Sequence, residues 1–286
     1  MKYLGVFDNP GQLVQDWISL TLPHRALIAC FSLATGLILS GYFDILILFF
    51  GVMMLILIYA SQAIYNNILD YEADKINAPD RPLPRGAISM KTAWAAYWVL
   101  IFLGLLSAFL ASPLLVPAAL LLAFIGYIYS KYTKGLFVLS YITLTISHMC
   151  VPLLFGYAIN APIDATIFTI IGFVFLANFI AVSVKDYKDV EGDRAVGLKT
   201  LPVLMGVRNA SYVTFFGFFL LALIFWIPWY FFGLSLTFMV AYGVIALLRL
   251  IYGYKLLRNP SPNVASGILK NFRYLIMLEM VAWWLG

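Results

Sequence analysis

Long apolar stretches, each near the length of a membrane-spanning helix, recur along the whole chain between short polar segments. A helix needs about 20 mainly apolar residues to cross the hydrocarbon core of a bilayer. The pattern predicts nine such helices, over residues 26–41, 45–64, 92–111, 113–130, 136–158, 163–184, 210–230, 234–254 and 272–286. The predicted fold class is therefore all-α: a polytopic membrane protein in which residues 1–286 form a single membrane-embedded domain.

The first 24 residues have a different, amphipathic pattern. On a helix, four apolar residues share one face, namely Leu13, Val14, Trp17 and Ile18. The polar residues Gln12, Gln15 and Asp16 lie elsewhere around it. A helix of this kind lies in the membrane interface. Residues 1–24 are predicted to form such a segment on the inner leaflet.

Composition supports a membrane protein. The 286 residues are 63% hydrophobic and only 11% charged, whereas soluble domains have roughly 25% charged residues. Both cysteines, Cys30 and Cys150, fall within predicted spans, so a disulfide framework is not expected.

The basic residues indicate the topology. If the N-terminus is cytoplasmic, the outward loops lie near residues 40–44, 112, 160–163 and 231–233, and they contain no Lys or Arg. All 18 basic residues then fall in the N-terminal segment, in inward loops or near inward helix ends, as the positive-inside rule requires. The N-terminus and the site are predicted on the cytoplasmic side and the C-terminus outside. The net charge of +5 is thus a topology signal and no argument for nucleic acid.

Eight of the 13 acidic residues lie in two short stretches, residues 70–80 and 186–193. On a helix, Asn66, Asp70 and Asp74 follow the spacing i, i+4, i+8 and share one face. Asp186, Asp189 and Asp193 follow i, i+3, i+7 and do the same. Stacked carboxylates repel one another, so each face is predicted to bind positive charge. Hard oxygen ligands suit Mg²⁺, which also binds substrate phosphates.

The two stretches also indicate an internal duplication. Asp70 and Asp74 map onto Asp189 and Asp193 with a constant offset of 119 residues. A proline-containing loop follows each stretch, over residues 79–86 and 197–202. A parallel duplicated unit of four helices is therefore predicted, with both acidic stretches on one side of the membrane.

A magnesium-bound diphosphate would be a good leaving group, because the metal withdraws electron density from the bond that breaks. An allylic group would then leave as a carbocation that aromatic faces could shield. Nearby donors that could hold the diphosphate are Tyr129, Ser130, Lys131, Lys134, Lys185, Arg81 and Arg85. Between the two arginines, a substrate role is predicted for Arg81 and an anchoring role for Arg85.

The two stretches resemble the signatures of the UbiA superfamily of intramembrane prenyltransferases. The first reads N-x-x-x-D-x-x-x-D followed by KINAPDRPLPRG, and the second reads KDYKDVEGD followed by GLKTLP. The segment YSKYTK, from Tyr129, resembles the family's connection between helices four and five. The resemblance implies a nine-helix bundle with two Mg²⁺ ions, a prenyl diphosphate donor, a lipophilic or aromatic acceptor and a membrane lipid environment.

Carried over by residue, the resemblance implies a catalytic and metal-binding cluster of Asn66, Asp70, Asp74, Asp189 and Asp193. The implied substrate contacts are Arg81, Lys185, Asp186, Tyr129, Ser130, Lys131, Lys134 and Arg25. The chain departs from the family at Asp80, where many members have Asn, and at Leu22-Pro23-His24-Arg25, where many have Arg-Pro-x-Asn. Arg25 either replaces a lost basic contact or marks a different acceptor end of the site.

Two other classes of protein fit the sequence less well than a prenyltransferase does. A cation-coupled transporter could use acidic faces, but its site normally lies near the bilayer midplane. A phosphatidyl-alcohol transferase carries a D-G-x-x-A-R signature, which this sequence lacks. The acceptor stays open among an aromatic acid, a quinone precursor, an ether-lipid precursor and a tetrapyrrole, as does the donor chain length. The second motif resembles archaeal ether-lipid synthases and chlorophyll-synthase-like members.

Overall fold

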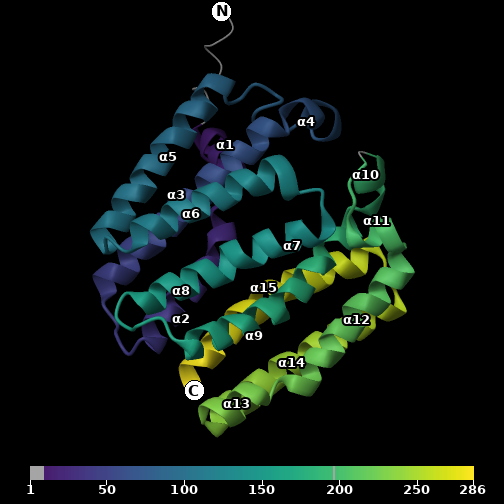
Figure 1. Cartoon of the computed structure of the whole chain (residues 1–286). Coiled ribbons are helices and arrows are strands. Elements are labelled where there is room, and N and C mark those ends of the chain that lie inside the picture. Colours follow the sequence, from purple (N-terminus) through teal and green to yellow (C-terminus); the bar gives the residue numbers. More distant parts are fainter. Residues whose placement is uncertain (1–9, 196) are drawn as a thin grey trace, which may run out of the picture. The chain divides into compact units, whose positions relative to one another are not determined.

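A computed structural model describes residues 10–195 and 197–286, apart from the side chains of residues 73, 76 and 77. The secondary structure of this part is helical, with a single isolated bridge between Leu136 and Lys199. The chain forms two compact units (Figure 1). Unit 1 comprises residues 1–30 and 44–131, and unit 2 comprises residues 31–43 and 132–286. That residues 1–286 form a single domain stays a prediction.

Unit 1 is built around one long helix. Its elements are α1 (Pro10–Thr21), η1 (Pro23–Ala26), α3 (Ile45–Leu69), α4 (Tyr71–Asn77), α5 (Met90–Ala111) and α6 (Leu115–Ile128). The central α3 packs against α5, α6 and α1. It begins where Asp44 accepts hydrogen bonds from the backbone of Leu46 and Ile47, at 2.7 and 3.1 Å, which satisfies two amides of the first turn. The approach of α5 is close, because a Cβ at Gly104 would lie only 2.9 Å from Ile58.

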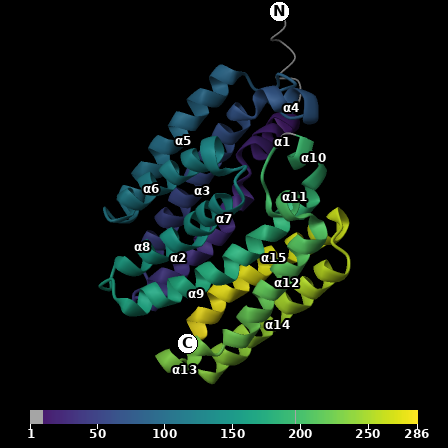
Figure 2. The same ribbon diagram turned by 45° about the vertical axis from the view of Figure 1, so that its right-hand side comes forward.

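Unit 2 contains the rest of the chain. The helix α2 (Leu27–Leu39) enters it from unit 1, and α15 and α14 pack side by side within it (Figure 2). Its other elements are η2 (Tyr129–Thr133), which begins in unit 1, α7 (Phe137–Thr145), η3 (Ile146–Cys150), α8 (Val151–Ala158), α9 (Ala165–Val182), η4 (Ser183–Lys188), α10 (Val190–Ala195), α11 (Leu201–Met205), α12 (Val207–Ile224), α13 (Ile227–Phe232), α14 (Leu236–Arg258), α15 (Pro262–Ala282) and η5 (Trp283–Leu285). Both η2 and η3 are π-helical turns.

The interior of unit 2 contains a buried charged network. Arg249 on α14 donates to Glu279 on α15 at 2.6 Å and to the Asn178 side chain on α9 at 3.2 Å. The Tyr242 hydroxyl donates to the second Glu279 oxygen at 3.0 Å. Arg249 is therefore buried in the middle part of a membrane-spanning helix. The prediction that all basic residues lie in the N-terminal segment, in inward loops or near helix ends is wrong for this residue. Buried charges of this kind persist only when they are paired.

Eight helical segments in the described part of the chain are long and apolar enough to cross a membrane. The predicted count of nine is therefore approximate. The discrepancy lies in α15, which begins at Pro262, ten residues before the predicted start. It includes Lys270, which the predicted spans place in a loop, and Arg273, which they place at a helix start. These charges, together with Glu279, interrupt the apolar pattern, so the helix is amphipathic and did not register as a full span.

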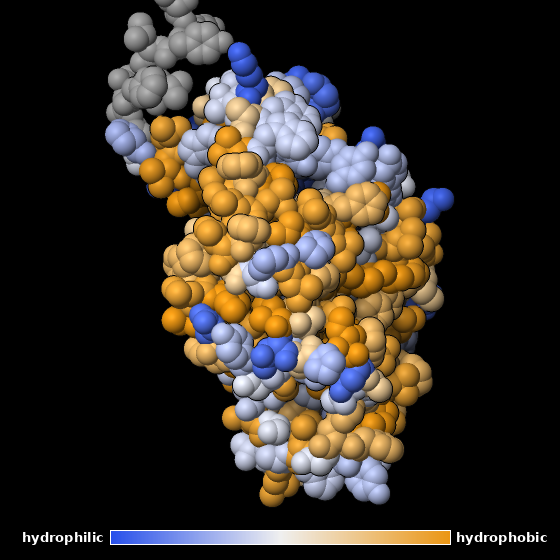
Figure 3. Space-filling model, turned by 60° about the vertical axis from the view of Figure 1, so that its left-hand side comes forward, coloured by the Kyte–Doolittle hydropathy of each residue, from blue (hydrophilic) through white to orange (hydrophobic). Residues whose placement is uncertain are grey.

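The surface of the described residues agrees with an integral membrane protein. Large hydrophobic side chains lie exposed on many helices, and they cover most of the face drawn in Figure 3. On α5, for example, Phe102 is 65% exposed. Val14 and Ile18 of α1 are exposed as well, as expected for an apolar helix face turned towards lipid. Residues 1–9 of the predicted interfacial segment lie outside the described part.

Candidate active site

The first acidic motif follows the end of α3. The Asp70 amide donates to the Asn66 carbonyl at 2.9 Å, and the Asp74 amide donates to the Asp70 carbonyl at 2.8 Å. This continues the four-residue hydrogen-bonding pattern of a helix from α3 into α4. The spacing predicted for Asn66, Asp70 and Asp74 is therefore present in the backbone. Asp74 is buried, and Arg81 donates to its carboxylate at 2.6 Å.

The second motif has a different local helix. Residues 183–188 form the 3₁₀ helix η4, in which hydrogen bonds join residues three apart. The Asp189 amide accordingly donates to the Asp186 carbonyl, at 3.3 Å. The Asp193 amide then donates to the Asp189 carbonyl at 2.8 Å, as α10 forms. The change from 3₁₀ to α geometry accounts for the spacing i, i+3, i+7 in the sequence.

The backbones of the two motifs match in ways that agree with the predicted duplication. The bond from Asp74 to Asp70 and the bond from Asp193 to Asp189 have the same length, 2.8 Å. The carbonyl of the last aspartate in each motif then accepts a further bond at 2.9 Å, from Ala78 in unit 1 and Leu198 in unit 2. Each loop also contains a glycine with positive φ, Gly86 or Gly197, a conformation that other residues rarely adopt.

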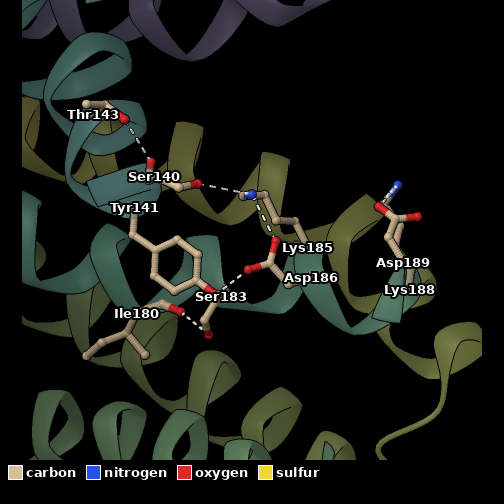
Figure 4. Close-up of polar contacts among 9 residues, drawn as sticks. All are labelled: Ser140, Tyr141, Thr143, Ile180, Ser183, Lys185, Asp186, Lys188 and Asp189. Carbon is tan, nitrogen blue, oxygen red and sulfur yellow. Dashed lines mark hydrogen bonds and ion pairs between the residues drawn. The ribbon is translucent and has the colours of Figure 1, made fainter. Parts of the chain in front are cut away.

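In unit 2, Asp186 is buried between two donors (Figure 4). The Tyr141 hydroxyl on α7 donates to one carboxylate oxygen, and the Lys185 ammonium donates to the other at 2.9 Å. Lys185 also lies 3.4 Å from the Ser140 hydroxyl. The structure thus pairs the two predicted substrate contacts, Lys185 and Asp186, with each other. Asp189 forms a more exposed ion pair with Lys188 at 3.0 Å.

The electrostatic environment of Asp193 is unfavourable for its own charge. Partial burial raises the pKa of this carboxyl above its usual 3.8, and repulsion from Asp186 and Asp189 raises it further. The Thr200 side chain and the Lys185 ammonium oppose this shift and lower the pKa. The described residues form no ion pair with Asp193. A cation bound here would stabilise the ionised carboxylate.

The residues at the two motifs fit magnesium with a diphosphate. They provide hard oxygen ligands, and within the described residues no three His, Cys, Asp or Glu side chains form a complete metal cage. Mg²⁺ normally uses one or two carboxylates and completes its coordination with waters and substrate phosphates. The Asn66 side-chain nitrogen is buried with no acceptor among the described residues, and a phosphate oxygen would satisfy it.

The remaining predicted contacts lie on short segments. Tyr129, Ser130 and Lys131 belong to the π-helical turn η2, where the Lys131 ammonium donates to the Tyr127 hydroxyl at 3.2 Å. Just after Lys134, the backbone of residues 135–137 pairs with Lys199 through bonds of 2.9 and 3.1 Å. This pairing brings the end of YSKYTK beside the loop of the second motif. Arg25 lies in η1. The roles of these residues stay predictions.

Several residues that hold the charged side chains of unit 2 in place were not predicted from the sequence. Tyr141 lies within an ordinary apolar span, where nothing marks it as the donor to Asp186. The Arg249–Glu279 pair had a signal, because charges inside predicted membrane helices are rare and usually have a function or a partner.

Together, the fold and the motifs define a class of protein: an all-helical integral membrane protein with two acidic motifs at helix ends. Residues 27–276 match the sequence model of the UbiA prenyltransferase family. The chain belongs to this family, and it is a prenyltransferase. The membership confirms the predicted fold and enzyme class and favours them over the transporter alternative.

The relatives define the similarity further. The digeranylgeranylglyceryl phosphate synthase of Thermococcus gammatolerans is 36% identical over 214 residues, covering 71% of this chain and 74% of that protein. A solved structure concerned with digeranylgeranylglyceryl phosphate synthase in membranes has a TM-score of 0.74 at 23% identity, covering 96% and 98% of the two chains. A UbiA homologue from Archaeoglobus fulgidus, bound to DMAPP and Mg²⁺, has a TM-score of 0.68 at 20% identity over 94% and 97%.

Proposed function

We propose that this protein transfers a geranylgeranyl group from its diphosphate to a lipid-soluble glyceryl phosphate that already carries one such group. The observation that carries the proposal is the pair of acidic motifs, whose last two aspartates have matching backbone hydrogen bonds and of which the second retains a raised pKa at Asp193. The relatives support the substrate class, because several are named digeranylgeranylglyceryl phosphate synthase. That name describes a product with two geranylgeranyl groups on one glyceryl phosphate.

Five residues would hold the metal. In unit 1 these are Asn66, Asp70 and Asp74, and in unit 2 they are Asp189 and Asp193. We propose two Mg²⁺ ions, with both motifs required for donor binding. When bound, the metal neutralises the diphosphate and makes it a better leaving group.

The chain's own side chains bind and orient the substrates. Arg81, whose guanidinium is about half exposed beside Asp74, would donate to the diphosphate oxygens, for which its planar fork is suited. Lys185, Asp186, Tyr129, Ser130, Lys131, Lys134 and Arg25 are proposed as further substrate contacts. The apolar helices would bury the prenyl tail and exclude water from the allylic cation, so that the acceptor oxygen, rather than water, attacks it.

The membrane orientation that we propose from the positions of the basic residues is compatible with this reaction. With the N-terminus and both motifs on the cytoplasmic side, a charged donor made in the cytoplasm reaches the site without crossing the bilayer. The C-terminus would lie outside. Cysteine labelling of intact cells, with reporters placed beside residues 80 and 160, tests this directly.

An acceptor competition tests the reaction. Purified protein in lipid nanodiscs is given Mg²⁺, labelled geranylgeranyl diphosphate and an equimolar mixture of geranylgeranylglyceryl phosphate and 4-hydroxybenzoate, and products are identified by mass spectrometry. We expect only the glyceryl phosphate to gain a prenyl group, and no product in chelator. Prenylation of the aromatic acid alone would overturn the acceptor proposal and leave the prenyltransferase class standing.

A further inference from the structure

Asp16 is a buried carboxylate on α1, outside the residues that match the family. Gln12 donates to one of its oxygens at 3.1 Å, and the Arg85 guanidinium donates to the same oxygen. A buried carboxylate is strongly destabilising unless it is paired. The ion pair therefore joins α1 to the loop that follows the first acidic motif, across 69 residues of sequence.

An apolar layer joins the same two segments. Leu20 of α1 is fully buried with Leu83 and Ile88 of the loop and Ile64 of α3. Trp17 packs against this cluster from α1. Burial of these side chains fixes the middle of the loop against α1 and α3. Arg85 is therefore held by its ion pair with Asp16 and by the apolar packing of the loop residues on either side of it.

The loop itself is stiff between Arg85 and Arg81. Pro82 and Pro84 restrict the backbone torsions. The Arg85 amide donates to the Arg81 carbonyl at 3.1 Å, and the Ile88 amide donates to the Pro82 carbonyl at 3.2 Å. Because this segment is locked by its own hydrogen bonds, a displacement of Arg85 would also displace Arg81.

Arg81 is the end of this chain of contacts. Its guanidinium donates to Asp74 at 2.6 Å, yet the arginine side chain is 49% exposed. An ion pair with one half-exposed partner is weaker than a fully buried one, because solvent screens it and the long arginine side chain must be held in one geometry. The position of Arg81 over Asp74 therefore depends on the loop, and the loop depends on Asp16.

We propose that Asp16 is a positioning residue for donor binding: through Arg85 and the Pro82–Pro84 segment it holds Arg81 at the first acidic motif. The inference rests on the proposed function, in which Arg81 and Asp74 bind the magnesium-diphosphate end of the donor. Asp16 makes no contact with substrate in this scheme. Asp16 affects the affinity for the prenyl diphosphate donor only through Arg81, and α1 thereby helps to position the active site.

A double-mutant cycle tests the proposal in the full-length protein. Steady-state kinetics with geranylgeranyl diphosphate and Mg²⁺ are measured for Asp16→Asn, Arg81→Gln and the double variant. We expect Asp16→Asn to raise the donor KM about fivefold with little change in kcat, and to add nothing further in the Arg81→Gln background, since residues acting through one another are not additive. Glu72→Gln is the matched control, because Glu72 forms an exposed ion pair with Lys75 near the same motif, and it should leave donor KM unchanged.

If Asp16→Asn does not fold, Arg85→Lys replaces it in the cycle. Lysine keeps the positive charge but lacks the planar guanidinium that bonds to Asp16. We expect a smaller increase in the KM for the prenyl diphosphate, again only when Arg81 is present. An unchanged donor KM, or the same increase with and without Arg81, would overturn the role of Asp16 and leave the proposed function intact. A wild-type donor KM for Arg81→Gln alone would overturn the function proposed for Arg81 and this inference with it.

Discussion

The two acidic motifs share the spacing and the backbone hydrogen bond of their last two aspartates, but their carboxylates are neutralised in different ways. In unit 1, the loop after the motif returns Arg81 to the buried Asp74. In unit 2, the lysines pair with Asp186 and Asp189, while Asp193 has a raised pKa and forms no ion pair within the described residues.

A repeated acidic pattern thus need not give a repeated electrostatic state. In the first motif, Arg81 already compensates the charge of Asp74 before any ligand binds. The second retains a negative field that a metal cation would relieve. We therefore expect substitutions of Asp74 and Asp193 to have similar effects on turnover but opposite effects on the stability of the metal-free protein.

Removing the carboxylates should have the largest effect. Asp70→Ala, Asp74→Ala, Asp189→Ala and Asp193→Ala should each lower turnover at least ~100-fold, because each removes a metal ligand or a charge that supports one. Glu72→Ala and Glu191→Ala, which alter acids on other faces of the motifs, should be milder. Turnover with labelled donor at saturating Mg²⁺ provides the measurement. Wild-type turnover in two of the four aspartate variants would contradict the assignment.

Arg81→Lys tests the compensation in the first motif. The charge is kept, but lysine cannot reproduce the planar fork. Loss of one charge-assisted hydrogen bond should weaken donor binding about tenfold. Arg85→Lys should have a smaller effect, since its partner is Asp16 rather than the donor. Donor-concentration kinetics of both variants decide the matter: two wild-type curves would leave the arginines only a topological role.

Metal and donor should stabilise the protein together. Without Mg²⁺ the acidic faces repel a diphosphate, and without diphosphate they hold the metal loosely. At saturation the donor should raise the thermal midpoint by about 5 °C in Mg²⁺, since ligands that bind only the native state stabilise it. In chelator no increase is expected. Equal shifts with and without metal would show that the donor binds independently of the metal.

The smallest expected effect concerns pH and distinguishes the motifs directly. The pKa of Asp193 is raised in the folded protein, so in the pH window from 3.8 up to the folded pKa the native state holds more protons than the unfolded state. Stability of the metal-free protein should therefore fall as pH rises through that window. The Asp193→Asn variant should not show this loss, so above the folded pKa it should be more stable than the wild type. The Asp74→Asn variant should be less stable than the wild type, because Arg81 loses its partner.

Thermal midpoints in chelator across pH 4–7 provide the measurement. The difference between wild type and Asp193→Asn should be small near pH 4 and constant above the folded pKa. A difference that is independent of pH would indicate that the effect of the substitution is on packing and not on charge.

Much of the fold could be predicted from the sequence because it depends on local rules. Apolar run length defines most spanning segments, and the spacing of Asn66, Asp70 and Asp74 persists because helical hydrogen bonds continue through the end of α3. The rule failed at α15, where Lys270 and Arg273 hide a helix whose interior face is decided by packing against α14.

Only the three-dimensional packing determines which polar and charged side chains meet. Asp16 and Arg85 are 69 residues apart, Tyr141 and Asp186 are 45 apart, and Arg249 and Glu279 are 30 apart. A periodic pattern determines which face of a helix is polar, but it contains no information on which neighbour will cover that face. The periodic pattern of the sequence therefore identifies the acids proposed to bind metal. The packing of helices and loops within each unit determines which of them pair with basic side chains, because charge pairing depends on distance in space and not along the chain.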